Sequence, residues 1–114
     1  MVGISAVYSY LEEHGIKHSN LGFRFLASAI MLGLESPAYC MKIASLYEEV
    51  AKEHSSNRAC VERAIRNCIP GGKITNKEFI AKAVDSLSAE QLEYKENASK
   101  IGLIHSNTVI SNNN

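Results

Sequence analysis

Hydrophobic positions in the first half of the chain recur with the spacing of amphipathic α-helices. Apolar residues at positions 4, 7, 8 and 11 predict a first helix that ends near His14, just before a glycine. A second helix is predicted to begin after Asn20, which suits an N-cap, and to end between Gly33 and Pro37. The apolar residues that mark this second helix are Leu21, Phe25, Leu26, Ala29 and Ile30.

The helical pattern resumes at Pro37, a residue that fits the first turn of a helix. Apolar residues with helical spacing then continue to Ala51, either as one helix or as two with a bend near Ser45. The polar run over residues 55–57 (SSN) predicts a break, because short polar side chains compete for backbone hydrogen bonds and favour caps and turns.

The next helix is predicted over about residues 57–69 and has two different sides. Its apolar stripe contains Val61, Ala64, Ile65 and Cys68. At about 100° per residue, the opposite side carries Ala59, Glu62, Arg63 and Arg66, with Arg58 to one side.

A last helix is predicted after the stop at residues 70–72 (PGG). Residues 75–78 (TNKE) form a capping box, in which the Thr and Glu side chains bond reciprocally to each other's backbone N–H groups. The buried side of this helix is expected to hold Phe79, Ile80, Ala83, Val84 and Leu87.

These patterns together predict an all-α fold, a compact domain of five to six helices. The chain has 114 residues, of which 46% are hydrophobic and 21% charged, as is usual for one globular domain. We expect the domain to span residues 1–96 and a flexible tail to span 97–114. With no membrane-length apolar run and no signal-peptide pattern, the predicted location is cytoplasmic, without a membrane partner.

The break at residues 55–57 joins two helices with the spacing of a helix-turn-helix. Small Ala51 in the first helix and apolar Val61 ten residues later fit a close crossing of the two helices. Ser55 stands where glycine is usual in such a turn. The N-terminal half of the second helix would enter the major groove of DNA. The residues at that place are Ala59, Glu62 and Arg63.

The formal net charge is zero, but the charges are distributed unevenly. Residues 52–82 contain seven Lys or Arg against three acids, whereas the rest of the chain contains five against nine. Such a separation would orient the basic part toward a polyanion. A merely solvated helical face explains the same counts.

Three blocks resemble the C-terminal effector domain of the stage 0 sporulation protein A family of sporulation response regulators. The block "CVERAIRNCI" is similar to the recognition helix of that family, and "TNKEFIAKAVDSL" is similar to its final helix. A third block, "HGIKHSNLGFRFLASAI", is similar to its second segment. The blocks occur in the family's order and cover roughly residues 3–88.

The resemblance implies a wingless helix-turn-helix domain that binds short promoter boxes in double-stranded DNA and regulates transcription. It allows a homodimer on tandem sites and implies no small-molecule substrate. By position, Glu62, Arg63 and Arg66 correspond to the family's groove-facing residues, and we add Arg58 and Ala59 as candidates. Cys60 replaces a family arginine, and the segment after the recognition helix is shorter than in the family. The phosphate-contacting candidates are Ser56, Asn57, Lys73 and Lys77.

Other functions receive less support from the sequence. The three cysteines form no C-x-x-C pair, so we expect reduced, mostly packed thiols and no metal. His14 and His18 have i, i+4 spacing but flank a glycine at a helix end. Catalytic motifs are lacking, so we expect neither an enzyme nor a cofactor. The stronger alternative is a degenerate effector domain, a protein-interaction module that binds or titrates a partner regulator.

Overall fold

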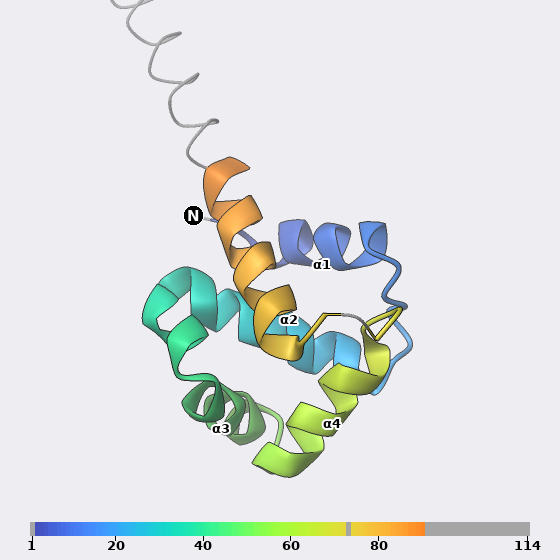
Figure 1. The fold of residues 1–114 in the computed structure, drawn as a ribbon, viewed down its shortest axis with the longest axis vertical. Helices are drawn as coiled ribbons and strands as arrows, with labels where there is room; N and C mark the ends of the chain where they lie inside the picture. The colour runs from blue at the N-terminus through green and yellow to red at the C-terminus, as the bar shows by residue number, and fades with distance from the viewer. Residues whose placement is uncertain (1, 73, 91–114) are drawn as a thin grey trace, which may run out of the picture.

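The computed structural model describes residues 2–72 and 74–90, and these residues form helices joined by short loops (Figure 1). No strand occurs in this part of the chain, which confirms the predicted all-α fold. The predicted tail over 97–114 and Lys73 lie outside the described residues. The elements are α1 (Ile4–Glu13), α2 (Leu21–Glu35), the 3₁₀ helix η1 (Pro37–Met41), α3 (Ile43–Glu53), α4 (Arg58–Cys68) and a final helix over residues 76–90, orange in Figure 1.

Helix α2 lies at the centre and packs against α1, η1, α3 and α4. Phe23, Leu26 and Ile30 are fully buried on it, at the i, i+3, i+7 spacing of one helix face. Leu21, one of the apolar residues that marked this helix in the sequence, is 67% exposed. It is the first residue of α2 and stands at the open end of the groove beside α4.

Helices α2 and α4 approach each other closely at Gly22. A Cβ atom at this position would collide with the carbonyl oxygen of Ala64 and lie 2.8 Å from the Sγ atom of Cys68. Only a residue without a side chain permits this distance between the helix backbones. Gly22 therefore sets how deeply α4 sits on α2.

The segment after α2 differs in detail from the predicted pattern. Gly33 lies inside α2, which ends at Glu35, and the chain then forms η1 from Pro37. The break before α3 is at Lys42, with φ −124° and ψ 63°, and not near Ser45. A proline at the start of η1 fixes the first turn, and the tighter 3₁₀ helix lets the chain reverse within five residues.

The final helix begins with the predicted capping box. The hydroxyl of Thr75 accepts a hydrogen bond from the Glu78 backbone N–H at 3.1 Å, and the Glu78 carboxylate accepts one from the Thr75 N–H at 3.0 Å. The Thr75 N–H and the Thr75 hydroxyl both donate to the Glu78 carboxylate, and these two hydrogen bonds lower the pKa of Glu78. The predicted inner side of this helix is confirmed, since all five of its residues are buried: Phe79, Ile80, Ala83, Val84 and Leu87.

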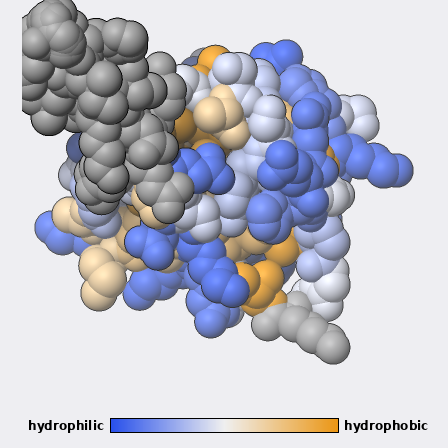
Figure 2. Space-filling view, turned by 90° about the horizontal axis from the view of Figure 1, so that it is seen from above, coloured by the Kyte–Doolittle hydropathy of each residue, from blue (hydrophilic) through white to orange (hydrophobic). Residues whose placement is uncertain are grey.

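The surface that Figure 2 shows is mixed, with hydrophilic side chains around small hydrophobic areas. Among the described residues, the large hydrophobic side chains that are exposed are Ile4, Leu21 and Met41. No helix in the described part of the chain is long and apolar enough to cross a membrane.

Candidate nucleic-acid interface

Helices α3 and α4 form a helix-turn-helix pair at one end of the domain, away from the end where the final helix leaves (Figure 1). The two residues predicted to meet at the crossing, Ala51 and Val61, are both buried. Ser55 adopts φ 53°, the left-handed conformation that favours glycine, and the Ser56 N–H donates to the Ala51 carbonyl at 2.8 Å. This six-residue hydrogen bond closes α3 as a Schellman motif, with serine where glycine is usual.

Helix α4 begins at Arg58 because Asn57 caps it. The Asn57 side-chain oxygen accepts a hydrogen bond from the Cys60 N–H at 2.9 Å, and the residue has extended backbone angles. The helix ends at Cys68, so it spans one residue less at each end than the predicted 57–69. Because phosphate oxygens accept hydrogen bonds, the part of the Asn57 side chain that could contact a phosphate is its amide nitrogen.

The outer side of α4, defined as Ala59, Glu62, Arg63 and Arg66, faces away from the core. Ala59, Arg63 and Arg66 are exposed and Glu62 is half-buried. The inner stripe is formed by Val61 and Ile65, which are fully buried, and by Cys68, which is nearly so. The predicted division of the helix into two sides is confirmed, with Ala64 half-buried between them.

The three arginines of α4 differ in their ion pairs. Arg66 pairs with Glu62 one turn earlier on the same helix, and Arg58 pairs with Glu48 of α3 at 3.5 Å. Arg63 makes no ion pair with any described residue. Glu62 pairs with Arg66 and not with its neighbour Arg63, because residues four apart on a helix lie side by side and adjacent residues do not. Among the described residues, no acid therefore pairs with the guanidinium of Arg63.

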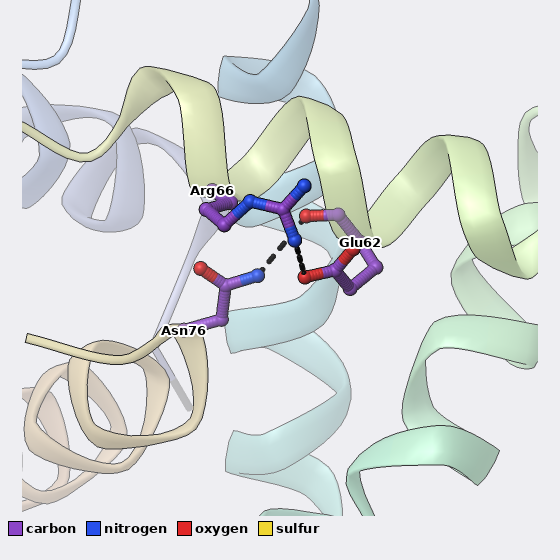
Figure 3. Close-up of polar contacts among 3 residues, drawn as sticks. All are labelled: Glu62, Arg66 and Asn76. Atoms are coloured by element: carbon purple, nitrogen blue, oxygen red, sulfur yellow. Dashed lines mark hydrogen bonds and ion pairs between the residues drawn. The ribbon is translucent and has the colours of Figure 1, made fainter. Parts of the chain in front are cut away.

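A polar contact connects the recognition-helix candidate to the final helix (Figure 3). The side-chain nitrogen of Asn76 donates a hydrogen bond to the Glu62 carbonyl oxygen at 3.1 Å. Tyr47 of α3 lies beside them, where burial raises the pKa of its phenol and a hydrogen bond from Asn76 opposes the rise. The sequence pattern located Asn76 in the capping box but gave no sign of this contact, because residues 62 and 76 are brought together only by the fold.

The predicted phosphate-contacting residues occupy different surroundings. Ser56 is half-buried in the turn, whereas Lys77 is exposed at the start of the final helix. Lys77 lines a hollow of about 440 Å³ together with Glu62, Arg66 and Asn76. Lys77 thus lies close enough to the outer side of α4 to serve the same ligand.

A second hollow, of about 330 Å³, runs between the start of α2 and α4. Leu21, Cys60, Arg63 and Asn67 are among the residues that line it. The sequence pattern did not indicate this groove, because it joins residues of two helices that only the fold brings together.

The cysteine and histidine residues form no metal site in the described part of the chain. All three thiols are free; Cys68 is buried, Cys40 is half-buried and Cys60 is exposed. The expectation of mostly packed thiols holds for two of them and fails for Cys60, which lies one residue before the inner stripe of α4. His54 caps α3 and shares a 2.8 Å hydrogen bond with Ser28.

Residues 7–105 match the family model described as the sporulation initiation factor Spo0A C terminal. The chain belongs to this family. The family comprises DNA-binding effector domains that regulate sporulation transcription, which confirms the resemblance seen in three sequence blocks. A comparison with individual curated proteins gave no significant match.

Proposed function

We propose that this Spo0A C-terminal domain binds double-stranded DNA sequence-specifically and regulates transcription, with α4 in the major groove. The observation that carries the proposal is Arg63: it is exposed at the middle of α4, on the side opposite the core, and no described acid occupies its guanidinium. A free guanidinium can donate two parallel hydrogen bonds to the O6 and N7 atoms of a guanine.

The neighbouring residues have supporting roles in this proposal. Ala59 is small enough to let the start of α4 approach the base edges, and Glu62 can accept a hydrogen bond from a cytosine amino group. Arg58 and Arg66 can exchange their present acidic partners for DNA, since both pairs are exposed and therefore weak. Lys77 and the amide of Asn57 would contact phosphates, which fix the register of the helix on the duplex.

A second function, binding of a partner regulator, is favoured by the groove between α2 and α4. Its wall contains the 67% exposed Leu21 and the exposed Cys60 next to Arg63. Exposed apolar side chains beside an arginine are typical of protein interfaces. In this case Arg63 would bind a carboxylate of the partner.

Selection of bound duplexes from a pool of random DNA separates the two functions. The proposal predicts an enriched motif that contains guanine. Recovery of random sequence after repeated rounds, from a folded domain, would instead support the interaction module. A homodimer on tandem sites would appear in the same experiment as two copies of the motif at a fixed spacing.

A further inference from the structure

Among the described residues, one polar side chain is buried. It belongs to Asn76, which is 8% exposed. Buried polar groups are costly unless they are hydrogen-bonded, so their partners reveal what they do. The partner of the Asn76 amide is the backbone carbonyl of Glu62, 14 residues earlier and in the middle of α4. The first residue of the final helix is thereby attached to the helix that carries Arg63.

The Glu62 carbonyl does not need this bond. Inside an α-helix a carbonyl accepts the N–H of the residue four positions later, here Arg66, and its second lone pair can remain free. The bond from Asn76 uses this second lone pair, so its effect is to fix α4 and the final helix relative to each other. Figure 3 shows that the Asn76 amide reaches α4 at the turn where Glu62 and Arg66 pair.

The capping box of the final helix leaves Asn76 available for this contact. Thr75 and Glu78 form the cap by hydrogen-bonding to each other, so the cap does not use the Asn76 amide. Tyr47 of α3 lines the same hollow as Asn76. Asn76 is therefore bonded to α4 and shares a hollow with a residue of α3, from outside the helix-turn-helix pair.

We propose that Asn76 is a positioning residue for DNA reading, which holds α4 in one place so that Arg63 and Glu62 meet the base edges in a fixed register. This inference rests on the proposed function of α4. Base discrimination needs a side chain held to a fraction of an ångström by the residues that support it. Phosphate contacts tolerate more movement, because they carry no sequence information.

The test compares Asn76→Ala with Thr75→Ala in the full chain. Both changes shorten a polar side chain at the start of the same helix, but Thr75→Ala removes only the cap and keeps the bond to Glu62. Unfolding midpoints are measured for both variants, and binding is measured at a temperature where both are folded. We expect Asn76→Ala to lower the ratio of selected-duplex to random-duplex affinity roughly tenfold, a value within the range of one lost base contact. Random-duplex affinity should stay as in the parent, and Thr75→Ala should keep the parent's ratio.

Amide hydrogen exchange without DNA tests the attachment by itself. Asn76→Ala should raise exchange rates along α4 roughly tenfold above those of Thr75→Ala, because opening of α4 no longer breaks the contact. Equal exchange in the two variants would overturn the inference. So would faster exchange with an unchanged affinity ratio, since Asn76 would then be purely structural. If the parent enriched no DNA motif, the proposed function would fail while the exchange result still showed whether Asn76 holds α4.

Discussion

The inner side of α4 is held by close packing against other helices, whereas the outer side carries charged side chains at the surface. On the inner side, Val61 and Ile65 are fully buried and Gly22 allows the backbone of α2 to approach Ala64. On the outer side, Glu62 and Arg66 form an ion pair with each other, whereas Arg63 pairs with no described residue. The inner side tolerates little change because atoms are already in contact. The outer side can change partners, so its function depends on which charges are free.

The largest expected effect is on the inner side, at Gly22. Because an added Cβ would meet backbone atoms of Ala64, which cannot rotate away, Gly22→Ala should lower the free energy of unfolding by about 3 kcal/mol. Urea unfolding followed by circular dichroism measures this loss. Gly3→Ala is the matched control, since its Cβ would meet nothing within 4 Å, and it should stay within about 1 kcal/mol of the parent. A Gly22→Ala variant as stable as the parent would contradict the close packing of α2 and α4.

The next largest effect concerns the outer side and salt. Arg58, Arg63, Arg66 and Lys77 are the described candidates for phosphate or base contacts, and each phosphate neutralised releases a counterion. Affinity for duplex should therefore fall roughly a hundredfold between about 50 and 200 mM salt. Fluorescence anisotropy with a labelled duplex measures the slope. An affinity independent of salt would exclude binding through this basic side.

A smaller effect is expected from releasing Arg66. Glu62→Gln removes the acidic partner of Arg66. Affinity for random duplex should rise about threefold, which is the size expected for the loss of an exposed ion pair. Preference for the selected motif over random duplex should weaken. Anisotropy titrations with both duplexes measure the two affinities. Glu35→Gln makes the same charge change at an exposed acid that has no ion pair with a described residue, and it should leave the preference unchanged. Sharper preference in Glu62→Gln would argue that Glu62 does not face the bases.

The smallest effect is expected in the turn between α3 and α4. Ser55 has φ 53°, so Ser55→Gly should raise the free energy of unfolding by about 0.5 kcal/mol, the relief of strain less the added entropy of the unfolded chain. Thermal unfolding measures the change. Ser56→Gly, next to it and without a positive φ, should be slightly destabilising. Stabilisation by both glycines would show that the conformation of Ser55 is unimportant.

The helices could be predicted from the sequence where the signal was local. Periodic apolar residues and the capping box at Thr75 located α1, α2, α4 and the start of the final helix to within a residue or two, but not the start of α3. The break at Ser55 was found because polar residues interrupted the pattern. The exposure of Leu21 could not be predicted, because periodicity identifies a side of a helix but not how far neighbouring helices cover it. The structure forms a 3₁₀ helix over Pro37–Met41. The apolar residues of this short segment did not distinguish a 3₁₀ helix from an α-helix.

The site was predicted less completely than the fold. The exposure of Arg63 follows from the helical period, but its lack of an acidic partner depends on Glu48 and Glu62 pairing with other arginines. The groove beside Cys60 and the bond from Asn76 to Glu62 join segments far apart in sequence. Contacts of this kind depend on tertiary packing, and the local pattern of a single sequence does not show which distant segments pack together.

The most direct test of the account is the affinity of Arg63→Ala for the duplex selected by the parent. Alanine keeps helix propensity and leaves the inner side untouched, so stability should stay within about 0.5 kcal/mol. Specific binding should weaken by about 1 to 3 kcal/mol, while Lys82→Ala, which removes an exposed cation from the final helix, should bind as the parent does. A folded Arg63→Ala variant that binds the selected duplex as tightly as the parent would contradict the account and favour the interaction module.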